Sequence, residues 1–106
     1  MNPVNFDLQA FEKAIAGDKP VLVDFWAPWC VYCRRIAPAY DKIAQQYGDR
    51  LVVAKVNIDE APLIANREQI EVIPTLVLYH KGQALGSIVA PESKARIEAF
   101  IEEALG

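Results

Sequence analysis

Continuous runs of apolar residues in the chain predict strands that are buried in a sheet. Four segments show this pattern: residues 19–27 (KPVLVDFWA), 51–57 (LVVAKVN), 70–80 (IEVIPTLVLYH) and 83–89 (QALGSIV). In the third segment, Pro74 has no N–H to donate to a neighbouring strand and is expected to precede the strand itself. Lys81 and Gly82 predict a tight hairpin turn between the last two segments. A short edge strand is also expected at Phe6 and the residues before it.

Apolar residues spaced three and four positions apart predict helices between these strands. Three stripes follow this spacing: Leu8, Phe11 and Ile15; Ile36, Tyr40, Ile43, Ala44 and Tyr47; and Ile97, Phe100, Ile101, Ala104 and Leu105. Asp7 is a suitable N-cap for the first helix, and Gly17 follows it as a stop signal. The second helix is expected to end at Gly48 and to bend at Pro38, and a short helix is expected over roughly residues 61–68.

The order of these elements predicts an α/β architecture. Strands and helices first alternate as β-α-β-α-β-α, which favours parallel strands joined by crossover helices. The final β-β-α adds an antiparallel hairpin, so the sheet is expected to be mixed, with four to five strands and helices on both faces. The chain contains no repeat, linker or low-complexity tract, and residues 1–106 are therefore expected to form a single domain.

The composition is that of a globular protein and argues against several classes of function. Hydrophobic residues make up 53 % of the 106 residues and charged residues 24 %, enough for a core that needs neither a metal nor a disulfide. The net charge of −3 argues against a nucleic-acid binder. The N-terminus lacks the basic start and apolar segment of a signal peptide, and no apolar stretch is long enough to cross a bilayer. We therefore expect a cytoplasmic protein that binds neither nucleic acid nor membrane.

Both cysteines of the chain lie in one short segment, residues 26–38 (WAPWCVYCRRIAP). Three structural interpretations of Cys30 and Cys33 compete with a redox one. A zinc site needs about four ligands, and the chain adds only His80 to the two cysteines, so no metal site is expected. A disulfide that closes a four-residue loop contributes only about 1.9 kcal/mol. Two buried, inert thiols are the third interpretation, which explains poorly why the pair lies between a strand and a helix.

The position of the pair favours a redox dithiol. Cys30 is expected at or near the N-cap of the second helix, where free N–H groups and the helix dipole stabilise an anion. The thiolate is the nucleophile in disulfide exchange. Lowering its pKa from about 8.5 to about 7 raises the thiolate fraction at pH 7 from roughly 3 % to roughly 50 %. Cys33 lies one helical turn further on, close enough to attack a mixed disulfide on Cys30.

The segment FWAPWCVYCRRIAP at residues 25–38 resembles the active-site segment of the thioredoxin family, in which W-A-x-W-C-G-P-C-K leads into a helix with I-A-P. Further segments resemble the family in the same order: VLVDFWA, VVAKVNID at residues 52–59, VIPTLVLYHKG at residues 72–82, and KARIEAFIEEAL. The resemblance covers essentially the whole chain. It implies the thioredoxin fold and the reduction of protein disulfides by thiol–disulfide exchange.

The resemblance also implies roles for five residues. Cys30 would be the attacking nucleophile, Cys33 the buried resolving thiol, and Pro74 a cis-proline that faces the disulfide. Asp24 would handle the proton of Cys33, with Lys55 as its charged neighbour. Asp24 also stands out by itself, because an unpaired carboxylate in a buried strand is costly and tends to stay protonated. The alternatives are an Asp24 side chain turned to solvent at the end of the strand, and a Lys55 side chain that simply points out of the sheet.

The surface around the cysteines is expected to bind substrate. Trp29 resembles the indole beside the family's active site, and Ile73 would offer its backbone to an extended substrate segment. Val31 and Tyr32, at the rim, replace the family's usual Gly-Pro. Val89 stands where the family usually carries glycine, in a loop that lines the substrate groove. We expect Val89 to narrow or reshape that groove.

The replacement of Gly-Pro is also expected to change the reduction potential. Unlike proline, Tyr32 keeps an N–H that can point at the Cys30 thiolate, and a stabilised thiolate favours the reduced protein. Arg34 and Arg35 act in the same direction or form a solvated face, and Trp26 would be the partly buried indole beneath the pair. The predicted potential is above the roughly −270 mV of thioredoxin, near about −200 to −230 mV.

The first hypothesis for function is therefore a protein-disulfide reductase. It would be a monomer that needs no bound cofactor and receives electrons from a reductase like thioredoxin reductase, by analogy an enzyme that uses a flavin and NADPH. An oxidase or isomerase working at a higher potential is the second hypothesis. The third is a binding module of the same fold, in which the dithiol is incidental. The presence of Cys30, Cys33, Asp24 and Pro74 together argues against this third hypothesis.

Overall fold

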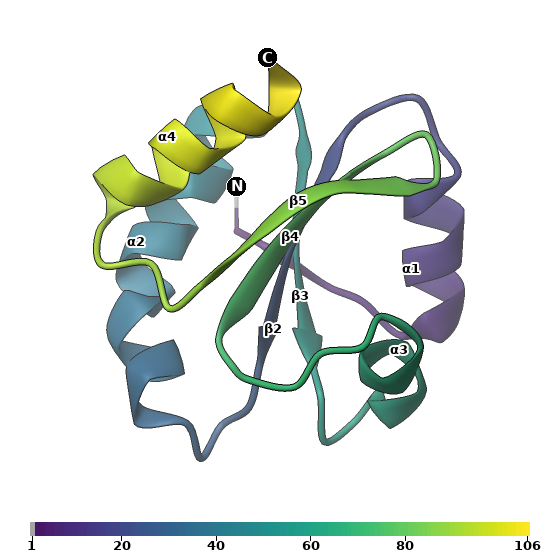
Figure 1. Ribbon diagram of the computed structural model, residues 1–106, viewed down its shortest axis with the longest axis vertical. Helices are drawn as coiled ribbons and strands as arrows, with labels where there is room; N and C mark the ends of the chain where they lie inside the picture. The colour runs from purple at the N-terminus through teal and green to yellow at the C-terminus, as the bar shows by residue number, and fades with distance from the viewer. Residues whose placement is uncertain (1) are drawn as a thin grey trace.

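The computed structural model describes residues 2–106, in which a five-stranded mixed sheet lies between two pairs of helices (Figure 1). The strands are β1 (Val4–Asn5), β2 (Val21–Trp26), β3 (Val52–Asn57), β4 (Thr75–His80) and β5 (Gln83–Val89). The helices are α1 (Leu8–Ile15), α2 (Val31–Tyr47), α3 (Pro62–Arg67) and α4 (Lys94–Leu105). This arrangement confirms the predicted α/β architecture with a mixed sheet and helices on both faces.

The strand order in the sheet is β1-β3-β2-β4-β5. The central strand β2 runs parallel to β3 and antiparallel to β4, and β4 pairs with β5 in an antiparallel hairpin. Lys81 and Gly82 form the turn of this hairpin with φ values of 54° and 81°. Two positive φ angles are what the favoured two-residue hairpin turn requires, and the predicted turn is confirmed.

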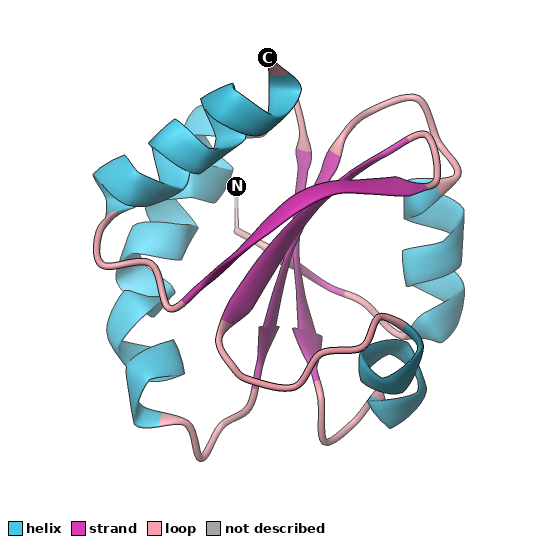
Figure 2. Cartoon of the chain, in the orientation of Figure 1, coloured by secondary structure: helices cyan, strands magenta, loops and turns pink. Residues whose placement is uncertain are grey.

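The sheet separates two hydrophobic clusters. Helices α2 and α4 cover one face and helices α1 and α3 cover the other, as Figure 2 shows. The predicted apolar face of α2 is fully buried, and Asp7 caps α1 by accepting the Ala10 N–H at 2.8 Å. In α4, Ile97, Phe100 and Ile101 are buried as predicted.

The prediction was wrong for Leu105, whose side chain is 39 % exposed. Leu105 is the last residue of α4, one turn beyond Ile101, and neither hydrophobic cluster extends to it. A stripe read from the sequence cannot show how far the core extends along a helix, because that depends on the packing of the whole molecule.

The topology brings four chain segments to one edge of the sheet. Because β2 and β3 are parallel, their carboxyl ends lie at the same edge. β4 begins there at Thr75, directly after Pro74, and Val89 at the end of β5 pairs with Thr75. The loop from β2 leaves the sheet at this edge and leads to Cys30, the N-cap of α2, and Cys33, in the first turn of that helix.

Candidate active site

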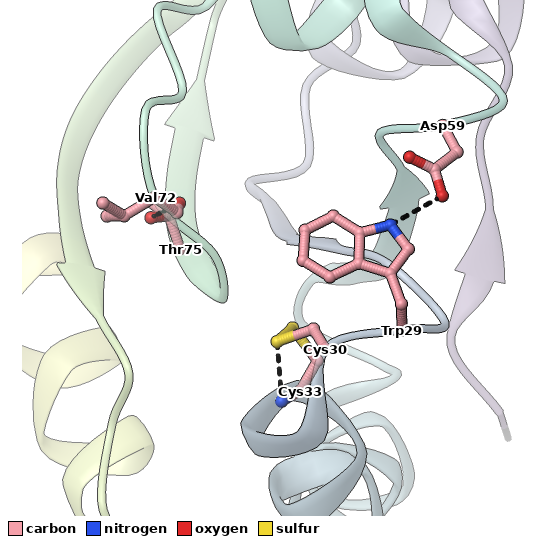
Figure 3. Close-up of a disulfide and its surroundings, with 6 residues drawn as sticks. All are labelled: Trp29, Cys30, Cys33, Asp59, Val72 and Thr75. Carbon is pink, nitrogen blue, oxygen red and sulfur yellow. Dashed lines mark hydrogen bonds between the residues drawn. A yellow bond between two sulfur atoms is a disulfide. The ribbon is translucent and has the colours of Figure 1, made fainter.

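Cys30 and Cys33 lie at the first turn of α2 and are joined by a disulfide (Figure 3). Cys30 is the N-cap residue, with extended backbone angles of φ −84° and ψ 110°. Its sulfur accepts the N–H of Cys33 at 3.2 Å. Cys30 is 9 % exposed and Cys33 is 3 % exposed, so Cys30 is the more exposed residue of the pair. Cys30 thus occupies the expected position, where amide groups at a helix start favour a sulfur anion.

The amide group that contacts the Cys30 sulfur differs from the expected one. The sequence suggested the N–H of Tyr32, at the second helical position, whereas the structure uses the N–H of Cys33, at the third. A short N-cap side chain commonly accepts from either position, and the helix geometry here selects the third. No acceptor for the Tyr32 N–H is found among residues 2–106.

Asp24 places a carboxyl group in the core beside the cysteine-bearing helix. Its side chain is 2 % exposed, which excludes the alternative of a strand-end side chain turned to solvent. Its Oδ1 atom has no hydrogen-bond partner among the described residues. Burial raises the pKa of Asp24 from 3.8 to about 7, and the positive charge of Lys55 partly opposes this shift. The charge of Asp24 also contributes, after burial, to the raised pKa of Tyr40 on α2.

Lys55 lies next to Asp24, since the two residues pair across the parallel strands β2 and β3. The Lys55 ammonium lies 4.1 Å from the centroid of the Trp26 ring, in a cation–π contact. The side chain therefore packs on the indole while its charge acts on the carboxyl group. Trp26 is partly buried, and its Nε1 atom has no partner among the described residues.

Trp29 stands at the surface beside the disulfide. Its side chain is 64 % exposed, and its Nε1–H donates to Asp59 Oδ2 at 2.9 Å (Figure 3). Sequence reasoning did not assign Asp59 a place in the site. A signal was available, because Asp59 follows β3 as Trp29 follows β2, and neighbouring parallel strands end at the same edge.

The segment at residues 72–75 faces the disulfide from the other side, as Figure 3 shows. The Ile73–Pro74 peptide bond is cis. Pro74 is buried and Ile73 half-buried, whereas Val72 is exposed. The Thr75 hydroxyl donates to the Val72 carbonyl at 2.7 Å and closes this turn.

The loop after β5 shows which residue has a backbone that favours glycine, and the expected effect of Val89 on the groove stays a prediction. Val89 is an exposed residue of β5 in ladder register with Thr75, and nothing in its backbone calls for glycine. The position that favours glycine is the next one, Ala90, where φ is 47°. An alanine gives no sequence signal for this conformation. The Ala90 N–H donates to the Pro74 carbonyl at 2.9 Å, which ties the loop to the cis-proline segment.

Exposed apolar and basic side chains surround the disulfide. Val31 is 61 % exposed, close to the exposure of Trp29. Arg34 and Arg35 are both exposed, and neither forms an ion pair with another residue of the described chain. Tyr32 is partly buried: its ring packs against the hydrophobic cluster on the α2 side of the sheet, and its hydroxyl donates to the Pro91 carbonyl at 3.2 Å.

The described residues contain no cluster of three or more histidine, cysteine or acidic side chains that could bind a metal ion. In residues 2–106, none of the helices is both long and apolar enough to span a bilayer.

Comparison with known proteins identifies the family. The family model described as Thioredoxin matches residues 2–103. A thioredoxin from Alicyclobacillus acidocaldarius subsp. acidocaldarius is 42 % identical over 95 residues, or 90 % of each chain. A thioredoxin from Acidithiobacillus ferridurans is 47 % identical over 91 residues, 86 % of this chain and 84 % of that one. The structure of a mutant thioredoxin from Halobacterium salinarum superposes with a TM-score of 0.88 at 25 % identity, covering 99 % of this chain and 92 % of that one.

These matches agree with the helix-start cysteine pair and with the thioredoxin fold. Proteins of the family act on protein disulfides, usually together with a thioredoxin reductase, and need no bound cofactor. The chain therefore belongs to the thioredoxin family and is a protein-disulfide reductase with a redox-active Cys30–Cys33 disulfide.

Proposed function

We propose that the chain reduces protein disulfides with Cys30 as nucleophile and Cys33 as resolving thiol. This assignment rests on the differences in position, hydrogen bonding and exposure between Cys30 and Cys33 at the start of α2. Cys30 is the N-cap, its sulfur accepts an amide N–H, and it is the more exposed of the two. A thiolate at this position is stabilised, and a nucleophile must reach its substrate.

The reaction proceeds in two exchanges. First, the Cys30 thiolate attacks one sulfur of the substrate disulfide, a bond forms to Cys30 Sγ, and the other substrate sulfur leaves as a thiolate. Second, the Cys33 thiolate attacks Cys30 Sγ, so that the Cys30–Cys33 disulfide forms and the second substrate sulfur leaves. Two electrons pass to the substrate, and its two thiolates take up the two protons that the cysteines gave up.

We propose that Asp24 accepts the proton that Cys33 loses when it ionises. Leu22 belongs to the cluster beneath α2, and Asp24, two positions further along the strand, faces the same side of the sheet. A carboxyl group with a pKa of about 7 is half ionised at neutral pH, so it accepts a proton from a thiol and returns it to solvent with little cost. Lys55 keeps this pKa from rising further.

Substrate binding is proposed for the rim around the disulfide. Trp29 and Val31 offer apolar contact area, and the backbone of Ile73 lies next to an exposed Val72, where an extended chain can pair with it. Val89 belongs to the same rim through its register with Thr75. This arrangement suits an extended protein segment on either side of the scissile disulfide.

The reduction potential is proposed to lie above the roughly −270 mV of thioredoxin. Among residues 2–106, the Tyr32 N–H has no acceptor and Arg34 and Arg35 form no ion pair, and all three residues favour a thiolate near Cys30. Each 1.4 kcal/mol in favour of the dithiol raises the potential by about 30 mV. We expect equilibration with glutathione to give about −200 to −230 mV, and Tyr32→Pro, which removes the N–H, to lower that value. A wild-type value of −270 mV or below would contradict the proposal.

Insulin reduction tests the function itself. Turnover with dithiothreitol and also with a flavin- and NADPH-dependent thioredoxin reductase is expected. Turnover with dithiothreitol alone would instead favour an oxidase or isomerase, and turnover with neither would favour a binding module. We further propose that residues 1–106 act as one monomeric domain in the cytoplasm, for which size-exclusion chromatography with light scattering and cell fractionation are the direct tests.

A further inference from the structure

Tyr32, between the two cysteines, is held at its hydroxyl and against one face of its ring. The hydroxyl donates to the carbonyl of Pro91, in the loop between β5 and α4, at 3.2 Å. The guanidinium of Arg35 lies 5.8 Å from the ring centroid. The side chain therefore connects the first turn of α2 to a loop that is 59 residues distant in sequence.

The loop that contains Pro91 is also held by a second hydrogen bond. The N–H of Ala90, the residue before Pro91, donates to the Pro74 carbonyl at 2.9 Å. Pro74 belongs to the segment that faces the disulfide, and Ala90 holds a left-handed backbone conformation between these two attachments. A single loop, residues 89–91, thus spans from the cysteine-bearing helix to the cis-proline segment.

We propose that Tyr32 is a positioning residue that fixes loop 89–91 as one wall of the substrate groove. The inference rests on the proposed function. A protein disulfide arrives within an extended chain, and residues beside its cysteines contact this wall. A small disulfide has no such flanking chain. The hydroxyl of Tyr32 is therefore expected to favour protein disulfides over small ones.

The test compares Tyr32→Phe with the wild type on two substrates, insulin and hydroxyethyl disulfide. The variant loses only the hydroxyl; it keeps the ring, the contact with Arg35 and the backbone N–H. We expect KM for insulin to rise about three- to tenfold, the loss typical of one hydrogen bond, with a smaller change in kcat. The ratio of kcat/KM for insulin to that for hydroxyethyl disulfide should fall by a similar factor.

Tyr47→Phe is the matched control. Its hydroxyl, also on α2, lies 3.4 Å from Glu102 Oε2, at the other end of the helix. The substrate ratio of this variant should equal that of the wild type. The reduction potential of Tyr32→Phe should equal the wild-type value, because the amide group remains.

Three results would overturn the inference. These are an unchanged KM for insulin in Tyr32→Phe, an equal loss with both substrates, and an equal change in the substrate ratio of Tyr47→Phe. If the wild type reduces insulin and any of these is found, only the role of the hydroxyl is refuted. If the wild type does not reduce insulin, the proposed function fails and this inference fails with it.

Discussion

Asp24 is held in the core at a position where burial opposes its ionisation. The carboxyl group is 2 % exposed, has an unpartnered oxygen, and ionises with a pKa of about 7. Such a group reduces the free energy of unfolding at neutral pH, because ionising it in the folded state costs more than in the unfolded chain. A carboxyl group that carries this cost is a natural candidate for proton transfer.

Replacing Asp24 by asparagine should remove the free-energy cost of ionising a buried carboxyl group. It should also remove the pH dependence of stability that this group causes. The folded pKa of about 7 lies above the unfolded value of 3.8, so the folded state binds more protons between these pH values. The wild-type free energy of unfolding should therefore fall as pH rises from about 4 to about 7. Urea unfolding should show Asp24→Asn more stable than wild type at pH 8, by up to about 4 kcal/mol, with a smaller difference at pH 4. Parallel pH curves for the two proteins would rule out a buried, shifted carboxyl group.

Lys55 should lower the pKa of Asp24 through its positive charge. Replacing Lys55 by methionine keeps the aliphatic packing on Trp26 but removes the charge that opposes the shift. The pKa of Asp24 is then expected to rise further above its wild-type value, as measured from the carbon-13 shift of its carboxyl group during a titration. Lys42→Met, at an exposed site on α2, is the control that changes the net charge equally. Equal changes in the pKa of Asp24 in both variants would show that this pKa depends on the net charge of the protein and not on the proximity of Lys55.

At the scale of elements, helix α2 and the β5–α4 loop define the site. The N-terminus of α2 carries the sulfur pair, and its apolar face fixes the helix on the sheet. In the loop, Ala90 bonds to the Pro74 carbonyl and Pro91 accepts from Tyr32, and Ala90 adopts a left-handed backbone conformation. For a residue with a Cβ atom, that conformation costs about 1–2 kcal/mol.

Ala90→Gly should stabilise the fold. Glycine adopts a φ of 47° without the clash of a Cβ atom, although it loses more backbone entropy on folding. The net gain in the free energy of unfolding is expected to be up to about 1 kcal/mol, from chemical denaturation at constant pH. Ala84→Gly, an exposed position in β5, should instead destabilise the protein because glycine weakens a strand. Destabilisation by both substitutions would contradict the assigned strain.

The elements were predictable because each depends on a local pattern. The buried run of β2, the apolar stripe of α2 and the turn at Lys81 and Gly82 are encoded within short windows of sequence. The pair Cys30 and Cys33 was predictable for the same reason. Features that depend on two distant segments were missed or misplaced, namely the Trp29–Asp59 bond, the conformation of Ala90, the Tyr32–Pro91 bond and the exposure of Leu105.

At the scale of the whole molecule, the fold brings the residues of the site together from separate parts of the chain. The start of α2, directly after the loop from β2, supplies the sulfurs. The loop after β3 supplies Asp59, and the segment before β4 supplies the cis-proline turn. The loop after β5 adds Ala90, which bonds to the Pro74 carbonyl. The parallel pairing of β2 and β3 places their carboxyl ends together, and the β4–β5 hairpin returns to the same edge. This convergence places the redox-active disulfide, Trp29 and the cis-proline segment at one end of the sheet.

The most direct test of the account is to trap the mixed disulfide. Reduced Cys33→Ser and reduced Cys30→Ser are each mixed with insulin, and the products are examined by mass spectrometry under non-reducing conditions. The account predicts that Cys33→Ser accumulates an adduct through Cys30, because the resolving thiol is gone, whereas Cys30→Ser accumulates little. Equal trapping by both variants, or trapping through Cys33 alone, would contradict the assignment of Cys30 as the nucleophile.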